Sequence, residues 1–225
     1  NQAAELVDVT KTYSLVEAVT LLKKFPAPKF DSTVTLSFAL GVDPRKSDQM
    51  VRGSVSLPHG TGKKVRVVVF ATGDAAKAAE AAGADKVGMD DLIKEVQDGF
   101  TDFDIAIATP DAMASVRKIA RVLGPRGLMP NPKTGTVTND TAKAIDAVKA
   151  GRIDYKIDKN ANVSAAIGKA SFDDAKLVEN AQALVDSLVK GKPASAKGNF
   201  IKAVTVTSSM NPGVKLDSSV FAPAV

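Results

Sequence analysis

The sequence predicts an α/β protein of two domains, in which an inserted, doubly wound α/β domain interrupts a sandwich-like α+β domain built from both chain ends. The middle of the chain reads as βαβαβα with nearly continuous apolar strands, which is typical of three-layer, Rossmann-like folds. The two outer parts each supply one helix and at least two alternating strands, too few for a layered domain alone. The expected domains are residues 1–62 with 152–225, and residues 63–151.

The first outer part is expected to hold one helix and two strands. Ser14 and Glu17 have the spacing of a capping box, in which each side chain satisfies a free amide at a helix start. Apolar residues follow at helical spacing until Pro26 stops the helix. Alternating residues predict strands over 33–40 and near 51–57, with a charged loop between them.

The middle part is expected to alternate strands and helices. Apolar runs predict its strands, and periodic stretches closed by glycine predict its helices. The strands are expected at 65–71, 86–87 and 104–108, and the helices at 74–82, 90–97, 110–123 and 140–150. Thr109 and Pro110 are the expected cap and first residue of the third helix.

The second outer part returns to short alternating strands. These are expected at 152–159 and 161–167, followed by a helix with Ser171 as its N-cap and Gly191 at its end. A final strand is expected over 200–208.

Glycines mark both crossings between the outer and middle parts. Gly60 and Gly62 lie on the way into the middle part, and Gly151 lies on the way out. Two glycine-bearing crossings between compact bodies predict a hinge.

The basic excess of the chain is unevenly distributed. The formal net charge is +5, and residues 64–151 contain 12 basic and 12 acidic residues, so the whole excess lies in the outer segments. Such an excess is often only a solvated face. Because these segments are expected to fold together, it indicates a polyanion partner. The chain has no Cys and no apolar run near the roughly 20 residues of a membrane span, so we expect neither disulfides nor membrane association.

Patterns for catalysis and nucleotide binding are weak. Gly60-Thr-Gly-Lys-Lys64 lacks the first Gly and the final Ser or Thr of a phosphate loop. His59 is the single histidine, which excludes a His-based metal cluster. Asp90 and Asp104, each beside a second carboxylate, stand at expected helix and strand starts, where carboxylates favour the helix dipole or face water. We expect no enzyme, no cofactor and no metal; a small-molecule or nucleotide-binding α/β protein is the alternative.

Two surface features are candidates for binding. Ser208, Ser209, Met210 and Asn211 place hydroxyls, a thioether and an amide at a strand tip, which is either an ordinary turn or a recognition edge. A second, weaker polyanion surface, or else a solvated face beside the rigid loop 124–135, is formed by basic residues of the middle part. These are Arg117, Lys118, Arg121, Arg126 and Lys133.

Long motifs in this sequence resemble the bacterial large-subunit ribosomal protein L1 family. The motifs are VRGSVSLPHGTGK (51–63), ATPDAM (108–113), LGPRGLMPNPKTGTV (123–137), KAGRIDYKIDK (149–159), GKASF (168–172) and TSSMNPG (207–213). They occur in the family's order and cover essentially the whole chain. The resemblance implies two domains, the second inserted into the first.

The resemblance also implies a function. It implies a structural protein of the large ribosomal subunit whose first domain binds ribosomal RNA and forms the mobile stalk beside the exit site for deacylated tRNA. The same surface is expected to bind the protein's own operon messenger RNA and repress its translation. The protein is then expected to be cytoplasmic, on the ribosome, and a monomer when free.

The RNA-binding residues implied by the resemblance come from three segments. They are Lys29, Phe30, Asp31 and Thr33; Gly168, Lys169 and Ser171; and Thr207, Ser208, Ser209, Met210 and Asn211. Ser209 stands where the family usually has Thr, which keeps the hydroxyl. Asn211 stands where Gly is usual, and we expect Asn to tolerate a left-handed backbone there.

Overall fold

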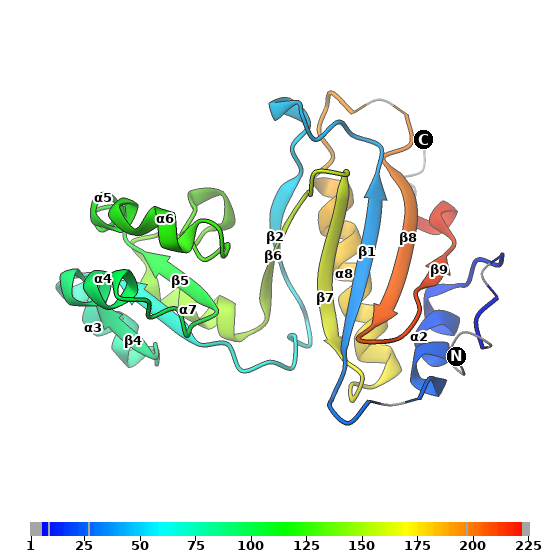
Figure 1. The fold of residues 1–225 in the computed structure, drawn as a ribbon, viewed down its shortest axis with the longest axis horizontal. Coiled ribbons are helices and arrows are strands. Elements are labelled where there is room, and N and C mark those ends of the chain that lie inside the picture. Colours follow the sequence, from blue (N-terminus) through cyan, green and yellow to red (C-terminus); the bar gives the residue numbers. More distant parts are fainter. Residues whose placement is uncertain (1–5, 9, 27, 197, 222–225) are drawn as a thin grey trace. The chain divides into compact units, whose positions relative to one another are not determined.

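The computed structural model describes residues 6–8, 10–26, 28–196 and 198–221. The chain groups into two compact units, one formed by Asn1–Gly62 with Gly151–Val225 and the other by Lys63–Ala150. Both units mix helices and strands, so the predicted α/β class is confirmed (Figure 1). Gly151, expected in the inserted part, groups with the outer segments, where its carbonyl accepts a hydrogen bond from Leu57 N at 3.3 Å.

A four-stranded antiparallel sheet forms the centre of the first unit. Its strands lie in the order β7 (Asn162–Lys169), β1 (Thr33–Leu40), β8 (Ile201–Ser208) and β9 (Val214–Leu216). Every second side chain of β1 is buried, which leaves the others on the opposite face. The buried side chains join one core with helices α2 (Leu15–Lys24) and α8 (Asp174–Lys190). Figure 1 shows α8 behind the strands of this sheet. The sequence does not predict β9, because its three residues become a strand only through pairing with β8.

The two helices of the first unit differ in how well their starts can be predicted. The capping box of α2 is confirmed: Ser14 Oγ accepts from Glu17 N at 3.3 Å, and Glu17 Oε2 accepts from Ser14 N at 3.0 Å. The prediction of Ser171 as N-cap of α8 is wrong. The helix starts after Asp173, because the Ser171 hydroxyl is engaged with Asp31.

A two-stranded antiparallel ribbon of β2 (Arg52–Ser56) and β6 (Arg152–Lys156) completes the first unit. Tyr155 is buried, and its hydroxyl donates to Ser187 O of α8 at 3.1 Å. Asn180 of α8 is also fully buried. Its Oδ1 accepts from His59 N at 3.1 Å, and its Nδ2 donates to Gly60 O at 2.9 Å and Ile167 O at 2.8 Å. The segment that follows β2 is therefore anchored to the core of the first unit.

The second unit is a parallel three-stranded sheet covered on both faces. Its elements are β3 (Val67–Phe70), α3 (Asp74–Ala81), β4 (Lys86–Gly88), α4 (Asp90–Gln97), β5 (Ile105–Ala108), α5 (Met113–Val116), α6 (Ala120–Leu123) and α7 (Thr141–Lys149). The strand order is β4-β3-β5. One face of β3 packs with α4, α5 and α6, and the other packs with α3 and α7. This arrangement is the expected three-layer architecture.

The third helix of the second unit differs from the prediction. It starts at Met113 rather than Pro110, and a 3₁₀ turn at Arg117–Ile119 divides it into α5 and α6. Val116 and Ile119 are both fully buried and lie three residues apart. That spacing places both on the same side of a 3₁₀ turn, so the turn keeps both residues in the core.

The crossing glycines also have a role in packing. Gly60, Gly62 and Gly151 have φ values of 66°, 71° and 104°, a region that other residues rarely adopt. A Cβ atom on Gly151 would lie 2.2 Å from the Gly60 Cα atom. The hinge assigned to these three residues stays a prediction.

We predict that Gly151→Ala destabilises the protein by about 2–4 kcal/mol, because both the backbone conformation and the contact with Gly60 oppose a side chain. Gly99→Ala is the matched control, since Gly99 has a φ of 107° and a Cβ atom added there would have no neighbour within 4 Å. Urea unfolding followed by circular dichroism measures both changes. Equal losses for the two variants would show that the close contact contributes nothing.

Candidate nucleic-acid interface

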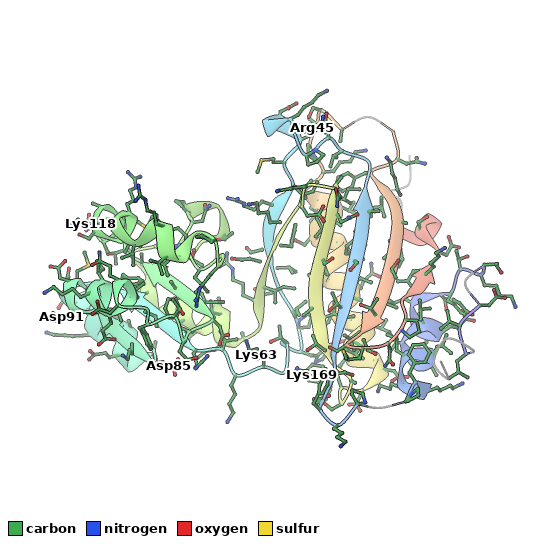
Figure 2. The ribbon with its side chains drawn as sticks, viewed as in Figure 1. Arg45, Lys63, Asp85, Asp91, Lys118 and Lys169 are labelled. Atoms are coloured by element: carbon green, nitrogen blue, oxygen red, sulfur yellow. The ribbon has the colours of Figure 1, made fainter. Side chains whose placement is uncertain are left out.

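The antiparallel topology brings three predicted binding segments together at one end of the four-stranded sheet. The start of β1 lies between the end of β7 and the end of β8, with Thr33 paired to Lys169 and Val34 paired to Ser208. Figure 2 shows Lys169 at this end of the sheet and Arg45 at the opposite end. We give the name strand-end surface to the surface formed by Lys29–Thr33, Gly168–Ser171 and Thr207–Asn211.

The tip of the strand-end surface is a four-residue turn. Asn211 N donates to Ser208 O at 3.1 Å and Asn211 Nδ2 donates to Ser208 Oγ at 2.8 Å. Met210 has a φ of 70°. The expectation of a left-handed Asn211 is therefore wrong, because the turn places the positive φ one residue earlier, as position i+2 of a type II turn requires. A Met in this conformation is strained by about 1–2 kcal/mol.

Two large apolar side chains project from the strand-end surface. Met210 is 88% exposed and Phe30 is 54% exposed. Lys29, the neighbour of Phe30, is also exposed. Stability favours neither an exposed Met nor a strained one, so this combination is typical of a site that binds a partner.

The polar groups behind the tip are fixed by one another. Lys169 Nζ donates to Thr33 Oγ1 at 2.9 Å and to Asp31 O at 3.4 Å. Ser209 N donates to Thr33 O at 3.1 Å, and Ser209 Oγ accepts from Thr33 N at 3.2 Å. The Ser209 hydroxyl thus has a structural partner within the protein.

Asp31 and Ser171 form a second connection across the strand-end surface. Ser171 Oγ donates to Asp31 Oδ2 at 2.7 Å, and Ser171 N donates to Asp31 Oδ1 at 3.2 Å. Gly168 is buried, and a Cβ atom there would lie 2.8 Å from Leu177 Cδ2. Gly168 therefore serves the packing beneath this surface, and Ser208, only 5% exposed, lies beneath it as well.

A groove of about 470 Å³ runs beside the tip. Phe25, Pro28 and Phe30 contribute apolar atoms to its wall, and Ser171 and Asn211 contribute polar ones. A groove of mixed character next to exposed Phe30 and Met210 can accept an amphipathic group such as a ribose or a base.

The second candidate surface lies within the second unit. Arg117 and Lys118 in the 3₁₀ turn and Arg121 in α6 are exposed, and among the described side chains no carboxylate forms an ion pair with them. Figure 2 labels Lys118 of this surface. Arg126 is exposed and donates to Thr101 Oγ1. The side chain of Lys133 lies outside the described part of the structure.

The weak catalytic patterns have structural explanations. Residues 60–64 lead towards strand β3 and not into a helix, unlike a phosphate loop. Partial burial acts to raise the pKa of Asp104, but hydrogen bonds from Lys63 Nζ, at 2.6 Å, and Arg66 N outweigh it and hold the pKa below its usual value. The described residues include no group of three or more His, Asp or Glu side chains placed to hold a metal ion. Within the same residues, no helix combines the length and apolarity that crossing a membrane requires.

The sequence from residue 22 to residue 212 matches the Ribosomal protein L1p/L10e family. The match covers most of the chain and includes all three segments of the strand-end surface. This chain belongs to that family.

Individual relatives within the L1p/L10e family are similar over nearly their full length. A protein named large ribosomal subunit protein uL1 from Corynebacterium glutamicum (strain R) is 58% identical over 219 residues, which cover 97% of this chain and 93% of the relative. Proteins of the same name are 58% identical in Mycolicibacterium vanbaalenii and 59% identical in Mycolicibacterium smegmatis, with the same coverage of both chains. Members of this family are structural proteins of the ribosome and not enzymes.

The open face of the sheet adds residues that the sequence analysis of this L1p/L10e family member missed. Thr35, Ser37 and Thr205 are half-buried on the face opposite the helices. Ser37 Oγ and Ser164 Oγ lie 2.9 Å apart. The alternation within β1 and β8 could have indicated them, because these residues share the face of Thr33 and Thr207.

We predict that Met210→Gly raises the free energy of unfolding by about 1 kcal/mol, because glycine adopts the left-handed conformation without strain. Met210→Ala is the control, since it removes the long side chain and keeps the strained Cβ atom. Urea unfolding measures both variants. A gain in Met210→Ala as large as that in Met210→Gly would show that exposure of the side chain, and not backbone strain, destabilises the tip.

Proposed function

We propose that this protein is a structural component of the large ribosomal subunit and binds large-subunit ribosomal RNA at the mobile stalk through the strand-end surface. The observation that carries the proposal is Met210, an exposed side chain on a strained turn beside fixed polar groups. Family membership and the names of the relatives support the ribosomal role. The protein then acts on cytoplasmic ribosomes and is a monomer when free.

The proposal includes two further roles that rest on the resemblance to the family. The protein helps deacylated tRNA leave the exit site, and it represses translation of its own operon messenger RNA. The strand-end surface supports the second role, because ribosomal RNA and messenger RNA would compete for it. Repression would then be relieved whenever free ribosomal RNA is available.

The chemistry of the strand-end surface suits a folded RNA. Exposed Lys29 can contact phosphate, which supplies affinity that falls with salt. Met210 and Phe30 can pack against ribose or base, and these contacts distinguish one RNA fold from another. Because the polar groups behind them are already fixed, binding requires ordering of the exposed side chains only.

The second unit carries the proposed contact with tRNA. Arg117, Lys118 and Arg121 present three charges on one short helical segment, and Arg126 lies on the loop that follows. Such a surface suits phosphates of a passing RNA without sequence readout. No observation favours the alternative of a nucleotide-binding protein.

We predict opposite signatures for an apolar and a basic residue of the strand-end surface. Met210→Asp should weaken binding of a stalk ribosomal RNA fragment at least about tenfold. Most of this loss should persist at high salt and not follow the slope of log affinity against log salt, because a lost apolar contact and a buried unpaired charge are not screened. Lys29→Ala should lower that slope by up to about one unit and weaken binding less at high salt. A salt titration of filter binding measures both.

Lys46→Ala is the matched control, since Lys46 is exposed in the loop that follows β1 at the other end of the sheet. It should change neither affinity nor slope appreciably. Full affinity in a folded Met210→Asp variant would remove the tip from the RNA surface and overturn the proposed function.

We predict that Asp31→Ala weakens RNA binding about three- to tenfold, although it removes a negative charge. Electrostatics alone would strengthen binding to a polyanion. Loss of the carboxylate, however, frees Ser171 N and Oγ and loosens the wall of the groove. Asp48→Ala removes an exposed carboxylate in the loop after β1 and serves as the charge control. Tighter binding by both variants would mean that Asp31 acts only through its charge.

A further inference from the structure

Asn211 is a residue of the strand-end surface whose role cannot be inferred from the resemblance to the family. The resemblance implies Gly at this position, and Gly brings no side chain to an RNA. Any role of the Asn211 side chain in recognition rests on the proposed function, namely RNA binding at the strand-end surface.

The backbone does not explain the presence of Asn211. Its φ lies outside the positive region that favours Gly or Asn, because Met210 takes that conformation. Its main-chain N–H closes the turn onto Ser208 O, a bond that any residue other than Pro could make. The side chain must therefore be explained by what it contacts.

One end of the Asn211 amide is fixed. Nδ2 donates to Ser208 Oγ at 2.8 Å, and Ser208 is buried. The other end, Oδ1, has no hydrogen-bond partner among the described residues, and the residue is half-buried in the wall of the groove with Phe30 and Ser171. An acceptor held in place without a donor is ready for a ligand hydrogen bond.

We propose that Asn211 Oδ1 accepts a hydrogen bond from a ribose 2′-hydroxyl of the bound RNA. The 2′-hydroxyl is a donor that RNA carries and DNA lacks. A phosphate offers no donor, so a carbonyl oxygen cannot bind it. Asn211 thus adds a contact that reads ribose, positioned by Ser208, where a glycine would leave a gap.

The experiment combines protein variants with single 2′-deoxy substitutions in the stalk ribosomal RNA fragment. In the wild-type protein, one deoxy position should weaken binding about three- to tenfold through loss of this bond. In Asn211→Gly, the unmodified RNA should bind about three- to tenfold more weakly, and the penalty at that same position should fall below about twofold. The salt slope should stay unchanged, because no cation is lost.

Ser208→Ala tests the positioning. It leaves the Asn211 amide intact but removes the hydrogen bond that positions it, so the binding penalty at the same deoxy position should shrink. In the double variant, adding Asn211→Gly to Ser208→Ala should cause little further loss of affinity. Circular dichroism should show a folded protein for all three variants, since none of the changes removes an apolar side chain from the core.

Three outcomes would overturn the inference. In the first, Asn211→Gly weakens binding but leaves the penalty at every deoxy position unchanged, which means that the side chain shapes the turn or contacts a base and not a ribose 2′-hydroxyl. In the second, Asn211→Gly binds the unmodified RNA as tightly as wild type. In the third, wild-type protein does not prefer the stalk fragment to a scrambled RNA, which would overturn the proposed function as well.

Discussion

The pairing of β1 between β7 and β8 is the constraint on which the strand-end surface depends. β1 comes from the first outer segment of the chain and both partners come from the second, so that paired residues such as Ser37 and Ser164 are 127 residues apart. Closing so long a loop opposes folding. The residues of the second unit lie between Gly60 and Gly151, whose backbones are in close contact. This contact brings the two ends of the long connection together and so reduces the length of chain that remains to be closed. Buried Asn180 then ties that return point to α8 and β7.

The same pairing explains why the strand-end surface is rigid before it meets a partner. Lys169, Thr33 and Ser209 belong to three different strands or their extensions, and their hydrogen bonds join the strand ends to one another. Their polar groups are largely satisfied inside the protein, so they hold the surface in shape. The groups with capacity left for a ligand are those at the rim, namely Lys29, Phe30, Met210 and the side-chain oxygen of Asn211. Preorganisation of this kind reduces the entropy lost on binding.

Local chemistry made much of this fold predictable, and long-range contacts decided the rest. Ser14 and Glu17 specify a helix start within four residues, and alternation along β1 specifies which side chains are buried. Ser171 shows the limit: it has the sequence of an N-cap, yet its hydroxyl bonds to Asp31, 140 residues away. The positive φ of Met210 was equally hard to predict, because residue type favours Asn211 and only the bonds to Ser208 fix the turn. The three segments of the strand-end surface were identified from sequence motifs. The residues on the open face of the sheet were identified only once the strand pairing was known.

The strain at Met210 is tolerated because of where it lies. Alternate residues of β8 point their apolar side chains into the core up to Val206. The Met210 side chain, in the turn that follows, lies outside that core. A strained residue inside the core would disturb packing against α2 and α8, but at the strand end its effect is confined to a turn closed by two bonds to Ser208. Stability alone would select Gly at this position, so an exposed Met indicates that the side chain is retained for a contact outside the protein. The fold therefore separates the residues that stabilise it from those available to a partner, and substitutions at the tip can alter binding while the sheet stays intact.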